Sequence, residues 1–166
     1  KRAMEIWQFL RDHDNGITNF HFEIEADILG PEALELLKTL RPGLIQLEIG
    51  VQSANPKTLE AIHRRTDLTK LKEITGTIRS GHNIHQHLDL IAGLPWEDYE
   101  SFGRSFDVVY GMKPDQLQLG FLKVLRGTSM YEDAKRYQIL YQAEAPYEVL
   151  ETPWLSHKEV IRLKQV

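Results

Sequence analysis

Cysteine is absent from the sequence, and that absence excludes several classes of site. Disulfide bonds, thiolate zinc sites, cysteine nucleophiles and cysteine ligands to an iron–sulfur cluster all need a residue that this chain does not contain. Long apolar runs are absent too, because no stretch approaches the ~20 residues that a membrane-spanning helix needs. No signal-peptide pattern opens the chain, so we expect a cytoplasmic protein without a membrane partner.

The chain also lacks an excess of basic residues. Its formal net charge is −4 and its isoelectric point is near 6.0, which argues against a broad electrostatic surface for nucleic acid. Hydrophobic residues make up 42% of the 166 positions, enough for one domain with its own core. The sequence begins inside a helical pattern and without methionine, so we expect a piece of a longer protein.

Turn and helix signals divide the chain into alternating strands and helices. Strands are predicted at 17–26, 44–51, 84–92 and 115–122. Helices are predicted at 1–12, 31–40, 68–79, 98–111 and 128–137, with a short helix from Pro56, a hairpin near 139–149 and a final helix capped by Ser156. Strands joined by helical connections favour right-handed βαβ units and a parallel sheet.

Each predicted strand alternates polar with apolar side chains, so one face of the sheet is polar. Glu25, Glu48 and Asp89 belong to this polar set. Burying such a carboxylate costs on the order of several kcal/mol unless another group pairs with it or water solvates it. A curved sheet whose polar side lines a cleft for a charged ligand resolves that cost, with the site at the carboxyl ends of the strands. An antiparallel sheet with one solvated face is the alternative.

Four short motifs then carry a resemblance to a known superfamily. They are Glu-Ile-Glu-Ala at 23–26, Ile-Gly-Val-Gln-Ser at 49–53, Asp-Leu-Ile-Ala-Gly-Leu-Pro at 89–95 and Arg-Gly-Thr at 126–128. In this order, each at a predicted strand end, they resemble the core of the radical S-adenosylmethionine (SAM) superfamily. The resemblance is to the branch with oxygen-independent coproporphyrinogen III oxidase, the Elongator catalytic subunit, methylthiotransferases and cobalamin-binding enzymes such as the anaerobic Mg-protoporphyrin monomethyl ester oxidative cyclase group. Trp96 stands where those relatives often carry glycine.

The resemblance implies an α/β fold, a partial (βα) TIM-like barrel. The four parallel strands seen here would match strands three to six of a six-stranded barrel with outer helices. The loop with three cysteines that binds the 4Fe–4S cluster would precede this chain. Residues 1–137 would then be the carboxyl-side portion of the barrel, and residues 138–166 a hairpin and helix that lead to a further domain.

The resemblance also implies six SAM-binding residues: Glu25, Gln52, Arg64, Asp89, Ile91 and Gly93. Glu25 matches an acid at the methionyl end of SAM, and Gln52 and Asp89 match residues near its ribose. Arg64 matches the arginine that pairs with the SAM carboxylate, which suits the two parallel hydrogen bonds that a guanidinium can donate. Ile91 and Gly93 would flank the adenine. No catalytic or metal-binding residue is assigned.

The function implied by the resemblance is that of an iron–sulfur oxidoreductase. The intact enzyme would cleave SAM reductively to a 5′-deoxyadenosyl radical that takes hydrogen from a small-molecule substrate, and this chain would supply SAM-binding strand ends. Without cluster cysteines the chain alone is expected to be inactive. Its cofactors would be SAM and a 4Fe–4S cluster held elsewhere, and cobalamin binding in the full-length protein stays open.

Two other functions remain as alternatives. One is a non-catalytic barrel that binds SAM, a nucleotide or a tetrapyrrole. The other is a metal-dependent barrel hydrolase that uses His85, His87 and Asp89, although hydrogen-bonded interior histidines are the default interpretation. A barrel that begins at its third strand would also leave 17–26 as a sheet edge, so we expect self-association through that edge or its coverage by helix 1–12.

Overall fold

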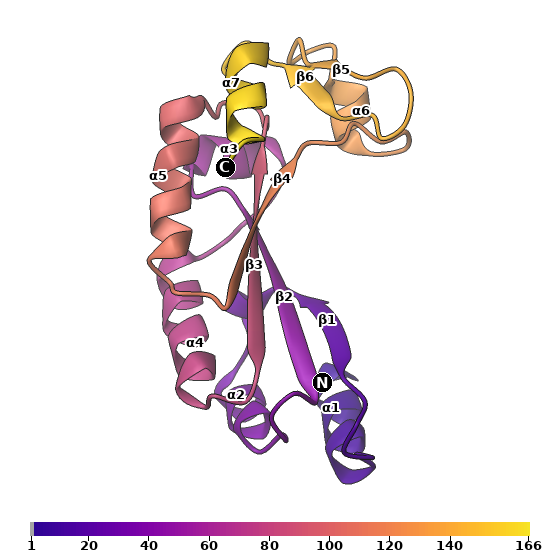
Figure 1. Cartoon of the computed structure of the whole chain (residues 1–166), viewed down its shortest axis with the longest axis vertical. Coiled ribbons are helices and arrows are strands. Elements are labelled where there is room, and N and C mark those ends of the chain that lie inside the picture. The colour runs from indigo at the N-terminus through magenta and orange to yellow at the C-terminus, as the bar shows by residue number, and fades with distance from the viewer. Residues whose placement is uncertain (1) are drawn as a thin grey trace. The chain divides into compact units, whose positions relative to one another are not determined.

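The computed structural model describes residues 2–166 (Figure 1). Its contacts divide the chain into two units. Unit 1 comprises Lys1–Val51, Thr66–Asp89 and Val109–Gln118, and unit 2 comprises Gln52–Arg65, Leu90–Val108 and Leu119–Val166. Three strands and one helix cross from one unit into the other along the chain.

The four predicted strands form one sheet. They are β1 (Phe20–Ile24), β2 (Ile45–Gln52), β3 (His85–Ala92) and β4 (Gln116–Phe121), in the spatial order β1-β2-β3-β4. All four run parallel, which confirms the predicted α/β class with a parallel sheet and excludes the antiparallel alternative. Between the first two strands the register places Phe20 opposite Ile45 and Ile24 opposite Ile49.

Strand β1 is shorter than the predicted 17–26. The side-chain oxygen of Asn15 accepts hydrogen bonds from the backbone amides of Ile17 and Thr18, at 3.0 and 2.9 Å. These amides are therefore committed to the turn and cannot join the strand. The strand begins only at Phe20, whose amide donates to the carbonyl of Leu44.

The helices of unit 1 cover the apolar side chains of the sheet. They are α1 (Arg2–Asp12), the short 3₁₀ helix η1 (Ala26–Ile28), α2 (Pro31–Lys38) and α4 (Leu68–Ser80). The prediction of a helix at 1–12 is confirmed from Arg2 onward, and Lys1 lies outside the described residues. Trp7 of α1 is buried and contacts Phe22 of β1 edge to face.

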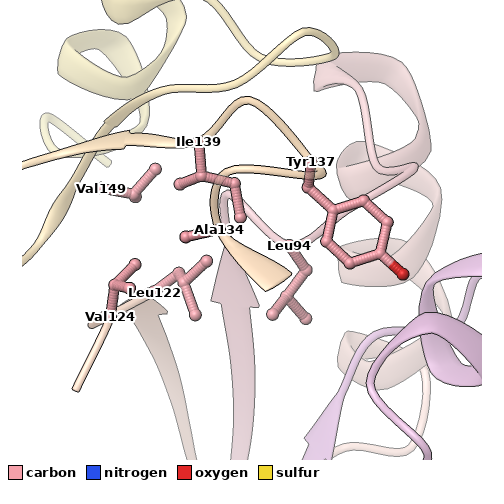
Figure 2. Close-up of a cluster of buried hydrophobic side chains, with 7 residues drawn as sticks. All are labelled: Leu94, Leu122, Val124, Ala134, Tyr137, Ile139 and Val149. Carbon is pink, nitrogen blue, oxygen red and sulfur yellow. The ribbon is translucent and has the colours of Figure 1, made fainter. Parts of the chain in front are cut away.

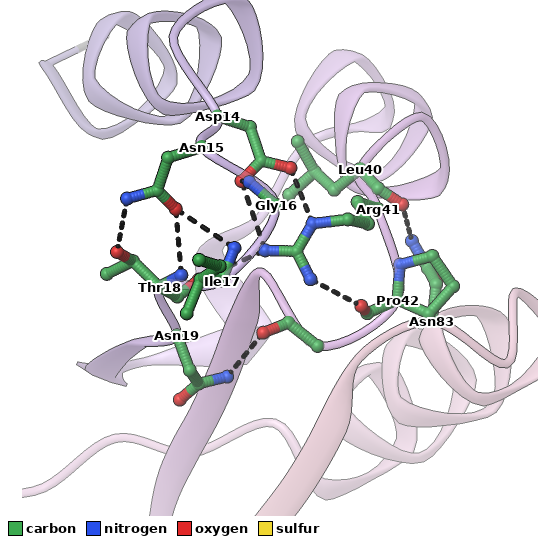
Figure 3. A network of polar contacts seen from close by, with 11 residues as sticks. Asp14, Asn15, Gly16, Ile17, Thr18, Asn19, Leu40, Arg41, Pro42 and Asn83 are labelled. Carbon is green, nitrogen blue, oxygen red and sulfur yellow. Dashed lines mark hydrogen bonds and ion pairs between the residues drawn. The ribbon is translucent and has the colours of Figure 1, made fainter.

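A polar network fixes the turns at one end of unit 1 (Figure 3). Arg41 donates to both carboxylate oxygens of Asp14, at 2.5 and 3.0 Å, and to the carbonyl of Thr18 at 3.1 Å. The hydrogen bond from Arg41 lowers the pKa of Asp14. Asn83 donates to the carbonyls of Leu37 and Leu40. The segments before β1, after α2 and before β3 are thus joined.

Unit 2 holds the remaining elements. They are α3 (Pro56–Ala61), α5 (Tyr99–Tyr110, of which residues up to 108 belong to this unit), α6 (Ser129–Asp133), β5 (Leu140–Tyr141), β6 (Val149–Glu151) and α7 (His157–Leu163). Strands β5 and β6 pair antiparallel, which confirms the predicted hairpin. Ser156 and Glu159 form a reciprocal capping box at the start of α7, as the sequence indicates.

The helix predicted at 128–137 ends early. Regular α6 stops at Asp133, and the amide of Ile139 then donates to the carbonyl of Ala134 while Gln138 adopts a left-handed φ of 52°. This turn reverses the chain so that Tyr137 and Ile139 both become buried.

One hydrophobic cluster forms the core of unit 2 (Figure 2). It comprises Leu94, Leu122, Val124, Ala134, Tyr137, Ile139 and Val149. The cluster includes residues on both sides of the predicted boundary at 137–138, and the role of 138–166 as a lead into a further domain stays a prediction. No helix within residues 2–166 is long and apolar enough to cross a membrane.

Candidate functional site

The polar face of the sheet in unit 1 carries a chain of titratable side chains. His21 of β1 lies 2.7 Å (Nε2) from Oε2 of Glu48 on β2, and His87 of β3 places Nδ1 3.9 Å from the same oxygen. Nε2 of His87 lies 3.1 Å from Oδ1 of Asp89, two residues further along β3. Because alternate residues of a strand point to the same face, the sequence pattern of these strands sets this cluster directly.

Asp89 holds its proton unusually tightly. Burial, followed by the hydrogen bond and the negative charge of Glu48, raises the pKa of Asp89 to about 7. The pKa of Glu48 is lowered, mainly by its hydrogen bond with Asp89 and less by its hydrogen bond with His21. Between the two pKa values the pair therefore has one negative charge, and Glu48 carries it.

Two atoms of this cluster have no hydrogen-bond partner within residues 2–166: Nε2 of His87 and Oδ1 of Asp89. Both are buried, and their 3.1 Å separation lacks the alignment of a hydrogen bond. Buried polar groups are rarely left unpaired in folded proteins. Oδ1 of Asp89 is therefore a candidate acceptor for a ligand hydroxyl.

Glu25, the other predicted site residue in unit 1, directly follows β1. It is exposed, has an extended backbone (φ −92°, ψ 98°) and makes no capping hydrogen bond to η1 although it precedes that helix. A helix-capping role, the ordinary structural explanation for such an acid, therefore does not apply. The predicted assignment to the SAM methionyl end is not tested by this placement.

In unit 2, Gln52 and Arg64 flank α3. Gln52 ends β2 with a left-handed φ of 70°, and its buried Oε1 has no hydrogen-bond partner among the described residues. Arg64 is half-buried, and its amide donates to the carbonyl of Leu59 at 2.8 Å. A left-handed backbone at a non-glycine residue costs of order 1–3 kcal/mol, so the orientation of Gln52 is held by its surroundings.

Ile91 and Gly93 lie at the end of β3 in unit 2. Ile91 is half-buried against the cluster of Figure 2. Gly93 has a φ of 88°, and a Cβ atom built on it would lie 2.7 Å from Cγ1 of Val149. Only glycine fits this position, because of both the backbone conformation and the side chain packed against it.

Gln52, Ile91, Gly93 and Glu25 lie at or directly after a strand end, whereas Asp89 lies within β3 and Arg64 follows α3. Glu25 and Asp89 belong to unit 1, and Gln52, Arg64, Ile91 and Gly93 belong to unit 2. Their assembly into one SAM site stays a prediction. The proposed metal triad does not form: in the part of the chain that the structure describes, no three His, Asp or Glu side chains are placed to hold a metal ion.

Sequence reasoning missed Glu97. This residue of unit 2 is 1% exposed, and its Oε1 accepts hydrogen bonds from Ser53 at 2.8 Å and Ser105 at 2.7 Å. Burial raises its pKa, against the lowering effect of the two hydroxyls. The available signal was Ser53, a small polar residue directly after a strand, but nothing in the sequence pairs it with positions 97 and 105.

Comparison with known proteins connects this geometry to a family. The chain is 29% identical over 110 residues to the oxygen-independent coproporphyrinogen III oxidase of Pseudomonas aeruginosa, across 66% of this chain and 23% of that protein. The coproporphyrinogen III oxidase HemN of Escherichia coli, described as a radical SAM enzyme, matches in structure with a TM-score of 0.63. That match has 22% identity and covers 75% of this chain and 29% of HemN. The predicted resemblance to the radical SAM superfamily is confirmed.

A second solved radical SAM protein shares the fold. The methyltransferase TsrM from Kitasatospora setae, whose structure contains cobalamin and a [4Fe-4S] cluster, matches with a TM-score of 0.66 and 13% identity, over 88% of this chain and 31% of TsrM. A family described as "Protein of unknown function (DUF4080)" matches residues 135–166. The chain therefore spans less than a third of the length of the radical SAM proteins that it matches.

The radical SAM resemblance allows a fit test for the cofactors. Asp89 and Gln52 each keep a buried acceptor atom without a partner among residues 2–166, which suits ligand hydroxyls such as those of a ribose. The chain does not hold a cluster by itself, because it contains no cysteine to ligate iron.

Proposed function

We propose that this chain supplies SAM-binding residues to a radical SAM enzyme of which it is a part. The observation that carries the proposal is the pair of orphaned buried acceptors, Oδ1 of Asp89 and Oε1 of Gln52, at positions that match ribose-binding residues. The sequence and fold likeness to coproporphyrinogen III oxidases supports it. Under this proposal Asp89 and Gln52 accept hydrogen bonds from the ribose.

The other predicted residues then bind the ends of SAM. Arg64 donates to its carboxylate, and exposed Glu25 accepts from its ammonium group. Ile91 and Gly93 lie beside the adenine, where glycine lets the backbone approach a flat ring closely. These residues bind and orient SAM, and such positioning is the share of the chemistry that the protein contributes.

The iron–sulfur cluster comes from outside this chain. In radical SAM enzymes it supplies the electron for reductive cleavage of SAM, after which hydrogen is taken from the substrate. We propose a small-molecule substrate and a cytoplasmic location. A cobalamin-dependent form of this function has one supporting observation, the fold likeness to TsrM.

A second candidate is a barrel that binds SAM without radical chemistry. The orphaned acceptors of Asp89 and Gln52 suit SAM binding with or without a cluster, so they support both functions. The two functions separate on the full-length protein under anaerobic reduction. Release of 5′-deoxyadenosine from SAM supports the enzyme, whereas SAM binding without cleavage supports the binding module.

The binding step itself is tested by calorimetric titration with SAM. We expect saturable binding that weakens by about tenfold in Asp89→Ala and in Arg64→Lys, since the first change removes the acceptor oxygen and the second removes a two-bond contact. Asp107→Ala, a change at an exposed acid of α5, serves as the matched control and should bind SAM like the unchanged chain. Equal affinity in all three variants would remove Asp89 and Arg64 from the site.

A further inference from the structure

Unit 2 contains a cavity of about 410 Å³ that none of the proposed SAM residues lines. Its wall is formed by the α3 region, the turn after β3 and the turn after α6. The lining side chains include Lys57, Glu60, His63, Trp96, Arg136 and Tyr137. Ligand sites for small molecules have volumes of roughly 300–1,000 Å³, so the cavity is large enough to hold one.

Two aromatic side chains form flat walls in this cavity. The ring of Trp96 lies 4.7 Å from that of Trp154, and the ring of Tyr137 lies 6.3 Å from the same indole. Trp154 thus holds both rings. Trp96 nevertheless stays 46% exposed, which is unusual for a side chain of this size.

The backbone of Trp96 is held in an unfavourable conformation. Its φ of 65° is left-handed, and its carbonyl accepts a hydrogen bond from Nδ2 of Asn55 at 2.9 Å. His63, on the same cavity, also has a left-handed φ, of 57°. Such strain at non-glycine residues concentrates at ligand sites. The position of the exposed indole is therefore fixed by the fold.

Two cations and two acids lie at the cavity, and the cations are the ones beside the aromatic rings. Nζ of Lys57 lies 5.9 Å from the centre of the Trp96 ring, and the guanidinium carbon of Arg136 lies 5.2 Å from the centre of the Tyr137 ring. Glu60 is the acid of the lining, and Asp133, near Arg136 at 3.7 Å, is the other acid in contact. Each aromatic wall thus has a cation beside it, in a chain whose net charge is −4.

We propose that this cavity binds a planar aromatic anion, meaning a flat ring system that carries a carboxylate, sulfonate or phosphate group. The ring stacks on the exposed indole of Trp96, since Tyr137 is buried. The anionic group pairs with Lys57, which lies over the Trp96 ring, and with Arg136, which lies over the Tyr137 ring. This site is independent of SAM and does not rest on the proposed function.

The test uses 2-naphthoate as the probe, with 2-naphthylmethanol as its neutral counterpart and acetate as an anion without a ring. Titration is followed by tryptophan fluorescence and by calorimetry on the purified chain. We expect 2-naphthoate to bind with a dissociation constant of about 1 mM or lower, and the other two compounds to bind at least about tenfold more weakly. A saturating concentration of SAM should leave 2-naphthoate binding unchanged.

Variants locate the binding. Arg136→Gln and Lys57→Met should each weaken 2-naphthoate binding by about fivefold, because each removes one cation and keeps most of the side-chain volume. Trp96→Leu should abolish stacking and weaken binding further, and circular dichroism checks its fold. Lys158→Gln, an exposed residue of α7, should bind like the unchanged chain.

Three results would overturn the proposal. Binding of 2-naphthylmethanol as tight as that of 2-naphthoate would show an apolar pocket that ignores charge. Displacement of 2-naphthoate by SAM would merge the cavity with the SAM site. Unchanged affinity in both Arg136→Gln and Lys57→Met would place the probe elsewhere, and these two variants decide the question even if Trp96→Leu does not fold.

Discussion

Asp89 in unit 1 and Glu97 in unit 2 are both acids whose pKa is raised, but their surroundings differ. Asp89 lies among charged and titratable groups, with Glu48 and His87 within reach, and its side chain is 14% exposed. Glu97 is 1% exposed and receives hydrogen bonds from two neutral serine hydroxyls. Burial is the largest cause of the raised pKa in both, but the hydrogen bond and charge of Glu48 raise the pKa of Asp89 further, whereas the two hydroxyls lower that of Glu97.

Each carboxyl keeps one buried oxygen without a hydrogen-bond partner among the described residues, Oδ1 of Asp89 and Oε2 of Glu97, so the two acids differ in their neighbours. Asp89 is hydrogen-bonded to Glu48, another acid. The hydroxyls on Glu97 come from Ser53 and Ser105, so that residue joins the end of β2 to α5. We therefore expect changes at Glu97 to affect folding, and changes at Asp89 to affect pH response and ligand binding.

The largest effect is expected from Glu97→Ala. The change leaves the hydroxyls of Ser53 and Ser105 buried without their acceptor and opens a cavity, which together cost about 3 kcal/mol of unfolding free energy. Urea denaturation measures this loss. Glu100→Ala, an exposed acid in the same region, should stay within about 0.5 kcal/mol of the unchanged chain. A loss below about 1 kcal/mol at Glu97 would contradict a structural role.

A second effect is expected in the pH dependence of stability. The folded chain holds the Asp89 proton up to a pKa of about 7, whereas an ordinary aspartate has lost it above 3.8. Asp89 therefore contributes stability fully below pH 3.8, and this contribution is lost as the pH rises toward 7.

Asp89→Asn removes that titration. We compare the melting temperature of the variant with that of the unchanged chain at each pH. The difference, variant minus unchanged chain, should be about 4 °C more positive at pH 8 than at pH 5. Differential scanning fluorimetry at the two pH values measures the difference, with Asp107→Asn as the exposed control. An Asp89→Asn difference that is the same at both pH values would show that Asp89 titrates like a surface acid.

The smallest effect is expected from the neighbours of Asp89. Glu48→Gln removes a negative charge and an acceptor beside Asp89, so the pKa of Asp89 should fall toward its ordinary value. Carbon-13 NMR titration of the carboxyl groups follows this directly. Glu23→Gln removes only a more distant charge and should lower that pKa less, and neither change should move the pKa of Glu97. Equal effects of the two variants would rule out the hydrogen bond as a cause.

Much of the sheet and of the polar face could be predicted from the sequence. Alternation along a strand is a local property, so the positions of Glu48, His87 and Asp89 on one face follow from it. The six site residues were instead assigned through the resemblance of short motifs to a known superfamily, which alternation alone does not provide. Local pattern also located the capped start of α7, since Ser156 and Glu159 lie within one turn.

The contacts that escaped prediction join residues far apart in sequence. Glu97 follows a turn and precedes Asp98, as surface acids do, and only the fold brings Ser53 and Ser105 to it. The cavity beside Trp96 likewise draws on three separate segments. Alternation and helical periodicity carry no information about such long-range contacts. Left-handed residues such as Gln52 are hidden for a further reason, since their side chains give no sign of the backbone conformation.

Gly93 has a consequence for how related chains can vary. The space that a side chain would need at this position is filled by Val149 of β6, within the segment 135–166 that matches a family of its own. A larger residue at 93 can be accepted only if residue 149 becomes smaller and the local backbone relaxes. Homologues should therefore change these two positions together, and an alignment in which they vary independently would show that the hairpin packs differently in those proteins.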